Sequence, residues 1–163
     1  MLTLGGFGAP PEFMYYRSLI MTPATYETDF YLWTQQQAAL LRQGALSALD
    51  IENLAEEVED MGKSNRLALE SYLSNVLMHL LKWQYQPERR ETSWKLSIRN
   101  GHRQIEKRLK NSPSLKPQLP AIIAEEYSPA RENAADETGL PLTTFPEQCP
   151  FTVEQITGDY WPD

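Results

Sequence analysis

The spacing of apolar residues between positions 50 and 85 predicts one long helix. Starting from Ile51 and advancing 100° per residue, a series of mostly apolar side chains stays on one side of the helix. The members of this series are Leu54, Val58, Met61, Asn65, Leu69, Tyr72, Leu73, Val76 and Leu80. A turn would reset this phase, so we expect the helix to run from Asp50, a favoured N-cap residue, to about Tyr85.

Gly62 falls at the centre of that apolar face. A glycine there costs about 1 kcal/mol relative to alanine, which favours a second backbone packing closely against it. The alternative is a long helix that bends at Gly62 and has nothing special opposite.

A shorter helix is predicted before the long one, from Tyr26 or Glu27 to Arg42. Thr28 is positioned to cap its start, and Gly44 is positioned to end it. Its apolar contacts are expected from Phe30, Trp33, Leu40 and Leu41.

Two further helices are predicted after Pro87, which breaks the long helix. The third helix runs from Trp94 to about Lys110, is capped by Ser93 and packs antiparallel against the long helix. Its inward residues are expected to be Trp94, Ile98, Gly101, Ile105 and Leu109.

The fourth helix is predicted to start between Leu115 and Pro120 and to end before Gly139. Because proline cannot donate a backbone hydrogen bond, Pro129 is expected to kink this helix or divide it, with Ser128 as a new cap. The third and fourth helices are expected to be antiparallel, with the helix at about 50–85 as the spine of the bundle.

The two ends of the chain differ from its centre. Residues 1–24 hold three glycines and three prolines in no clear period, so we expect a flexible N-terminal extension. Residues 25–163 are predicted to form a single all-helical domain. Its last part, residues 139–163, holds four prolines and is predicted to be an irregular tail over the bundle, with Thr152 capping a single turn. No stretch alternates like a strand for long enough to propose a sheet, so the predicted fold class is all-α.

Several sequence blocks resemble a bacterial, largely cyanobacterial, family. These blocks are YETDFYLW at 26–33, NLAEEVEDMG at 53–62, HLLKWQYQP at 79–87, SW at 93–94 and TGLP at 138–141. Over about residues 24–163 the chain therefore resembles the domain-of-unknown-function family numbered twenty-nine. The resemblance implies an all-helical bundle, and it implies no activity, cofactor or catalytic residue.

Composition narrows the class of protein. With 163 residues, 41% of them apolar, the chain is long enough to bury a core. Cys149 is the only cysteine, which excludes an intrachain disulfide and a multi-cysteine metal site. No run approaches 18 apolar residues and no signal peptide is evident, so we expect a cytoplasmic protein with no membrane partner. The formal net charge of −7 disfavours bulk affinity for nucleic acid.

Basic residues are concentrated between positions 82 and 116, where ten basic residues accompany three acidic ones. The candidate residues for an anion or a partner are Arg89, Arg90, Arg99, Arg103 and Lys107. The last three share the face of the third helix opposite its apolar residues, which is a pattern that can contact phosphates. We favour a solvated face, or one that pairs with acidic residues of the same or a neighbouring subunit. Arg89 and Arg90 are also expected to clamp the inter-helix connection to a carboxylate.

The acidic counterpart lies early in the long helix. It consists of Glu56, Glu57, Glu59 and Asp60. Glu57 and His79 are weak candidates for metal ligands, because 22 residues of straight helix would separate them by about 33 Å. Acidic first turns that complement the helix dipole explain the cluster without a metal. His79 and His102 are expected to be hydrogen-bonded packing residues, and no cofactor is expected.

The preferred functional hypothesis is a non-enzymatic helical interaction module that self-associates or binds a protein partner. The first alternative is a nucleic-acid or anion binder that uses the basic stripe of the third helix. The second alternative is a metal-dependent enzyme that uses the cluster at 56–60 together with His79.

Overall fold

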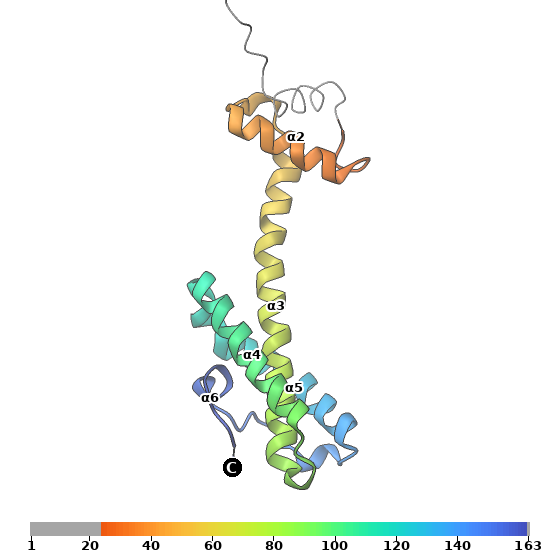
Figure 1. Cartoon of the computed structure of the whole chain (residues 1–163), viewed down its shortest axis with the longest axis vertical. Helices are drawn as coiled ribbons and strands as arrows, with labels where there is room; N and C mark the ends of the chain where they lie inside the picture. The colour runs from red at the N-terminus through yellow and green to blue at the C-terminus, as the bar shows by residue number, and fades with distance from the viewer. Residues whose placement is uncertain (1–23, 163) are drawn as a thin grey trace, which may run out of the picture. The chain divides into compact units, whose positions relative to one another are not determined.

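The computed structural model describes residues 24–162 and contains only helices (Figure 1). Its α-helices are α2 (Phe30–Gln43), α3 (Ile51–Tyr85), α4 (Thr92–Asn111), α5 (Leu119–Thr138) and α6 (Val153–Thr157). Short 3-10 helices connect them, namely η1 (Leu46–Ala48), η2 (Pro87–Arg89), η3 (Pro113–Gln118) and η4 (Leu142–Thr144). No strand occurs in this part of the chain, which confirms the predicted all-α class. The predicted N-terminal extension, residues 1–24, lies outside the described residues apart from its last position.

The predicted spine helix is confirmed as α3, which continues through Gly62 and ends at Tyr85. The chain divides into two compact units, Met1–Asp60 and Met61–Asp163, and α3 contributes residues to both. A single domain over residues 25–163 therefore stays a prediction.

The start of α2 is set by Asp29, whose Oδ1 accepts the backbone N–H of Leu32 at 2.9 Å. The predicted cap, Thr28, is wrong because its hydroxyl lies 2.7 Å from that of Thr25 and stabilises the preceding turn instead. The helix consequently begins a few residues later than predicted. It ends at Gly44, as predicted, with the glycine in the left-handed conformation at φ 68°.

Polar contacts around Asp50 fasten α2 to the start of α3. As predicted, Asp50 precedes the first residue of α3, and its Oδ1 accepts the backbone N–H of Asn53 at 3.4 Å. Its Oδ2 accepts the indole N–H of Trp33 at 3.1 Å, and its own N–H donates to Gln37 at 2.8 Å. Among residues 24–60 only Trp33, Gln37 and Ala39 are buried, so this junction is held mainly by hydrogen bonds.

Several apolar residues that were predicted to make core contacts are exposed in the first unit. Phe30 and Leu41 are 48% and 50% exposed, and Ile51 and Val58 are 67% and 61% exposed. The unit has too few helical segments to cover more than one face of each helix. The predicted inward series of α3 is therefore wrong at its start and correct from Leu69 onward, where its members are buried except for Tyr72, which is partly buried against the core.

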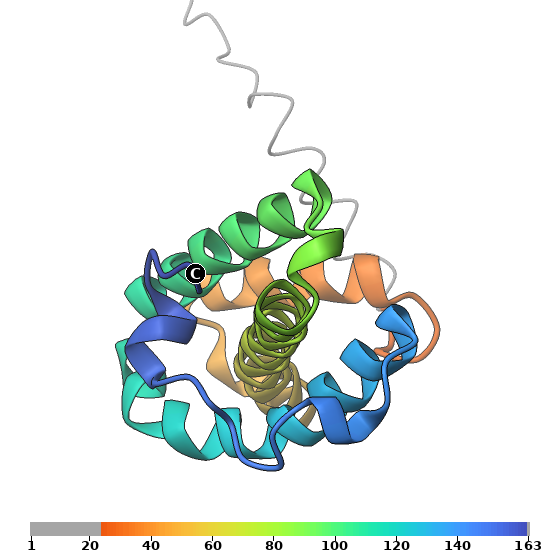
Figure 2. The same ribbon diagram turned by 90° about the horizontal axis from the view of Figure 1, so that it is seen from below.

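The second unit is a bundle in which the later turns of α3 lie between α4 and α5 (Figure 2). Helix α4 runs back along α3, and α5 returns in the opposite direction, so the predicted antiparallel arrangement is confirmed (Figure 1). The core side chains with no exposed surface are Leu69, Leu73, Val76, Leu77, Leu80, Leu81, Ile98, Ile105, Ile122, Ala130, Ala134 and Ile156.

The close approach of two helix backbones occurs at Gly101 and not at Gly62. A Cβ atom on Gly101 would lie 2.2 Å from Cγ2 of Val76, so α4 can contact α3 here only with a glycine. Within the described part of the chain, no atom of a neighbouring segment lies within 4 Å of the corresponding position on Gly62. The prediction at Gly62 is wrong because this part of α3 is uncovered, as the 64% exposure of Met61 also shows.

The boundaries of the later helices differ from the predicted ones in two places. Helix α4 begins at Thr92, and Ser93 lies inside it, where its hydroxyl donates to the carboxylate of Glu91 at 3.1 Å instead of capping the helix. Helix α5 is continuous, so Pro129 does not divide it. Pro129 and the residue four positions earlier are exposed, so water can reach the carbonyl that the missing N–H leaves free. The helix ends at Gly139 as predicted.

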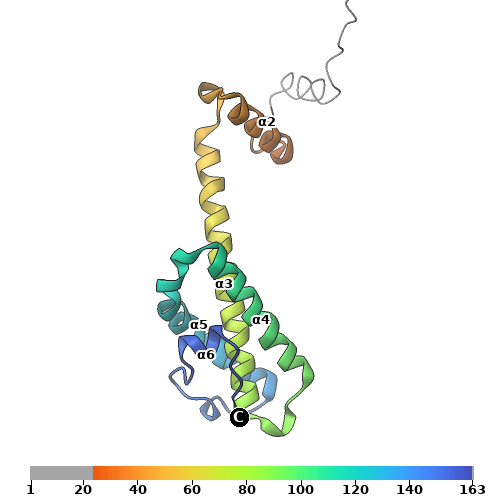
Figure 3. The ribbon, with the colours of Figure 1, turned by 60° about the vertical axis from the view of Figure 1, so that its left-hand side comes forward.

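The segment after α5 is docked onto the second unit up to residue 162. It buries Phe145, Phe151 and Ile156 in the core. The hydroxyl of Tyr127 donates to the carbonyl of Pro146 at 2.6 Å and holds the segment on α5. Thr152 caps α6 in a reciprocal pair of hydrogen bonds with Gln155, as its sequence predicted. This packing brings α6 against α4 and α5 (Figure 3).

Candidate functional site

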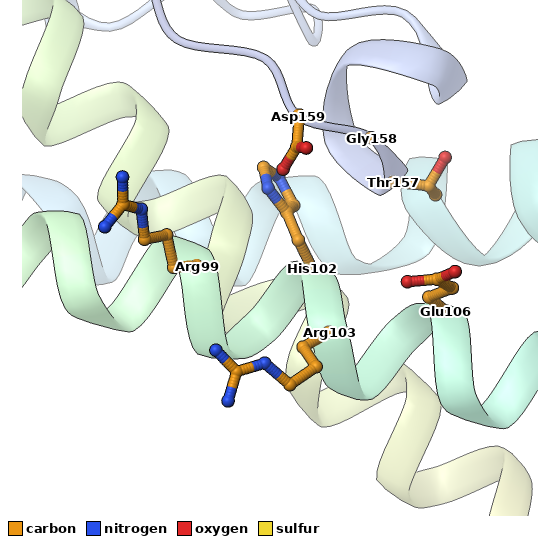
Figure 4. A pocket seen from close by; sticks show the side chains of 7 residues that line it. All are labelled: Arg99, His102, Arg103, Glu106, Thr157, Gly158 and Asp159. Atoms are coloured by element: carbon orange, nitrogen blue, oxygen red, sulfur yellow. The ribbon is translucent and has the colours of Figure 1, made fainter.

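A groove of about 650 Å³ opens between α4 and the end of α6 (Figure 4). Its walls are Arg99, His102, Arg103 and Glu106 from α4, and Thr157, Gly158 and Asp159 from the C-terminal segment. Arg99 and Arg103 are four positions apart, as are His102 and Glu106, which places the members of each pair on neighbouring turns of one side of the helix. The residues that border the groove thus carry two guanidinium groups, one imidazole and two carboxylates, and the guanidinium groups of Arg99 and Arg103 point away from the His102 ring (Figure 4).

His102 is the buried polar group of this groove. Its side chain points from α4 toward Asp159 and is only 6% exposed (Figure 4). Among the described residues neither of its ring nitrogens has a hydrogen-bond partner. Burial lowers the pKa of His102, and the negative charge of Asp159 opposes that shift. His102 is buried, as predicted for a packing histidine. The predicted hydrogen bond to it is not present among the described residues.

Arg99, Arg103 and Lys107 form the predicted exposed stripe on α4. None of the three makes an ion pair within residues 24–162. The opposite face of the helix is buried at Trp94 and Ile98, as predicted. The structure thus brings Arg99 and Arg103 to the groove and leaves Lys107 on the same face beyond it.

Arg90 has a different partner from the predicted one. Its Nε donates to the backbone carbonyl of Trp83 at 2.9 Å, and its guanidinium lies 5.0 Å from the centre of the Trp83 ring. Arg90 therefore clamps the connection to the last turn of α3, where carbonyl groups lack helical partners, and not to a carboxylate. Arg89 is exposed and is not among the groove residues. A smaller hollow of about 400 Å³ lies between Arg90, Arg99 and Trp161.

The acidic cluster of Glu56, Glu57, Glu59 and Asp60 lies on the first turns of α3. The hydroxyl of Tyr26 donates to Oε1 of Glu57 at 2.6 Å. This hydrogen bond is the main cause that raises the pKa of Tyr26 to about 12. Glu57 is thus a tether for the segment before α2, while Glu56 is exposed.

No group of three His, Cys, Asp or Glu side chains within the described part of the chain is arranged to hold a metal ion. His79 is buried, and its Nδ1 lies 2.8 Å from the carbonyl oxygen of Asn75. Burial is the main cause that lowers the pKa of His79, and the positive charge of Lys82 lowers it further. The structure adds no ligand to the two weak metal candidates, Glu57 and His79.

We expect the free energy of unfolding to fall between about pH 7.5 and about pH 5.5, in part because of His79 and His102. Both pKa values are lowered in the folded protein, so the unfolded chain takes up protons first as the pH falls below about 6.5. The two histidines cause no loss of stability well above that pH, and the loss grows as the pH falls toward their pKa values in the folded protein. Urea unfolding in a phosphate-free buffer measures the free energy of unfolding at each pH. Between about pH 7.5 and about pH 5.5 the His102→Gln variant should lose less stability than the wild type. Equal losses of stability in the wild type and in the variant would contradict the contribution of His102.

The comparisons with known proteins identify one family. The model for the domain of unknown function DUF29 matches residues 25–161. The chain belongs to the DUF29 family. This result confirms the resemblance seen in the sequence blocks. Neither the comparison of this DUF29 chain with curated proteins nor that with solved structures found a match. No helix in the described part of the DUF29 chain is both long and apolar enough to cross a membrane.

Proposed function

We propose that this DUF29 protein is a non-enzymatic interaction module that self-associates, with the first turns of α3 of one copy against α4 of another. The acidic side of the contact is residues 50–60, which contain six acidic residues and no basic one. On this segment Ile51 and Val58 are more than 60% exposed and are spaced seven residues apart, with Leu54 between them. This spacing is typical of a helix face that packs against another helix.

The basic side of the contact is the exposed face of α4. This helix carries six basic residues and one acidic residue. Its exposed face contains Leu96, Arg99, Arg103, Lys107 and Lys110, which follow one another at intervals of three or four residues. Leu96 is 58% exposed and supplies an apolar contact among the charges. The face matches the acidic segment in both charge and apolar content.

The main support for this proposal is that the acidic face of residues 50–60 and the basic face of α4 are both exposed and complementary. Because both faces belong to the same chain, two copies can exchange them reciprocally, which closes a two-fold dimer. The first unit also has few buried side chains, and units of this size commonly need a partner to complete a core. Covering Ile51 and Val58 would supply apolar burial that residues 24–60 lack by themselves.

A charge-swap experiment tests the proposal. One variant, Glu52→Lys/Glu56→Lys, reverses two charges of the acidic face, and a second, Lys107→Glu/Lys110→Glu, reverses two charges of the basic face; all four positions are exposed. Sedimentation equilibrium at tens of micromolar should show a wild-type dimer that dissociates about tenfold more readily when salt rises from about 50 to about 300 mM. Each variant should dimerise much more weakly than the wild type, and their equimolar mixture should dimerise more strongly than either variant alone.

The control is Glu132→Lys/Asp136→Lys, which reverses two exposed charges on α5 and should leave the dimer unchanged. A wild-type chain that is monomeric at low salt would overturn the proposal. So would a mixture of the two charge-swap variants that stays monomeric, because the contact would then lie elsewhere. The cytoplasmic location and the bacterial origin stay predictions.

A further inference from the structure

We propose that the groove between α4 and the end of α6 binds a small phosphate monoester through Arg99, His102 and Arg103. The three side chains come from adjacent turns of α4 and border one hollow. Two guanidinium groups one helical turn apart can each offer a fork of N–H donors to phosphate oxygens. Because neither arginine is engaged by a carboxylate within residues 24–162, both are available to a ligand.

The second observation is the unsatisfied imidazole of His102. Buried polar groups in proteins are nearly always paired, and leaving one unpaired costs about 1–3 kcal/mol. His102 is more than nine-tenths buried, has no hydrogen-bond partner at either ring nitrogen within residues 24–162, and borders the groove. A phosphate oxygen is a strong acceptor for an imidazole N–H, and the carboxylate of Asp159 lies on the same side of the ring (Figure 4). A ligand would thus satisfy the group that the fold leaves unpaired.

The remaining groove residues indicate that the ligand is larger than a bare ion. A volume of about 650 Å³ falls in the range of sites for organic molecules and exceeds the needs of inorganic phosphate. Glu106 and Asp159 offer acceptor oxygens to hydroxyl or amino groups. The hydroxyl of Thr157 already donates to the carbonyl of Val153 at 2.9 Å and therefore faces a ligand as an acceptor. A phosphorylated molecule with several hydroxyl groups fits this arrangement.

The proposed site shares Arg99 and Arg103 with the basic face of the proposed dimer, but the two proposals can be tested apart. The dimer test alters Glu52, Glu56, Lys107 and Lys110, none of which lines the groove. A chain that stays monomeric can still bind the ester, whereas in a dimer the ester would compete with the acidic face for Arg99 and Arg103. The two proposals are consequently tested by separate measurements.

NMR of the imidazole signals provides a direct test, because the chain has only two histidines. Inorganic phosphate and glycerol 3-phosphate are titrated at constant ionic strength, with sodium chloride as the reference. The ring signals of His102 should move and saturate, whereas those of His79, which is already paired with Asn75, should stay in place. The ester should bind at least about fivefold more tightly than phosphate. His79→Gln assigns the two signals and leaves the groove unchanged.

Two variants locate the binding. Arg99→Gln/Arg103→Gln should weaken binding of glycerol 3-phosphate at least about tenfold, since both phosphate forks are removed. Arg89→Gln removes an exposed arginine outside the groove and should leave the affinity unchanged. His102 signals that do not move, or that move together with those of His79, would overturn the proposal. A response to succinate but not to phosphate or its ester would overturn the assignment of a phosphate ligand.

Discussion

Replacing Glu137 with alanine is expected to lower the free energy of unfolding by about 2–3 kcal/mol. Its Oε2 lies 2.5 Å from Nζ of Lys82, and the Lys82 side chain is only 5% exposed. The ammonium group also lies 4.4 Å from the centre of the Trp94 ring. Without Glu137 the buried ammonium group keeps this ring contact but loses its carboxylate partner, so the folded state loses most of the compensation for burying the charge. Glu137 is itself half exposed, which places the loss at the lower end for buried pairs.

The matched variant is Lys82→Met, which removes the charge and keeps an apolar stem of similar length. Its free energy of unfolding should stay within about 1 kcal/mol of the wild-type value, because the carboxylate that loses its partner is that of Glu137, which water can reach. The double variant Lys82→Met/Glu137→Ala should recover most of the stability lost in Glu137→Ala. Urea unfolding followed by circular dichroism measures all three. Equal losses for the two single variants would show that the ion pair, and not the isolated buried charge, sets the effect.

Replacing Gly101 with alanine is expected to destabilise the fold by about 2 kcal/mol, although alanine is the better helix former by about 1 kcal/mol. The new Cβ would lie 2.2 Å from Cγ2 of Val76, a fully buried side chain on the facing helix. Either α4 must move away from α3 or Val76 must leave its rotamer. The same substitution at Gly62 meets open space and should stabilise the protein by about 1 kcal/mol.

The double variant Val76→Ala/Gly101→Ala separates the clash from other causes. Removing the Val76 methyl groups makes room for the new Cβ, so the double variant should be more stable than the sum of the two single losses predicts. If the losses in free energy of unfolding of the two single variants simply add up in the double variant, the contact between Gly101 and Val76 would be contradicted. Thermal and urea unfolding of the wild type and the four variants, including Gly62→Ala, give the comparison.

The misplaced helix starts have a common physical origin. At the start of α2, Thr28 and Asp29 are both good cap types, and the structure uses Asp29 because Thr28 is engaged with Thr25. At the start of α4, Ser93 is a good cap type that lies inside the helix. Several adjacent residues can satisfy the first free N–H groups, so local preference selects the region of a helix start but not the residue.

The sequence by itself determined the all-α class and the span of α3, because the apolar period is a local property that continues through Gly62. It also determined the inward face of α4 and the glycines that end α2 and α5, since these depend on residues within one or two turns. The membership of the chain in the DUF29 family was readable from five short blocks.

Only the tertiary structure decided which parts of these helices are covered. The apolar series on α3 is continuous in sequence, yet Val58 is exposed and Leu69 is buried, because burial depends on what packs opposite. Glycine spacing does not reveal that Gly101 faces Val76 while Gly62 faces open space. The sequence does not reveal the groove for the same reason. His102 acquires its unpaired, buried position only when a segment more than 50 residues later in the chain folds over α4.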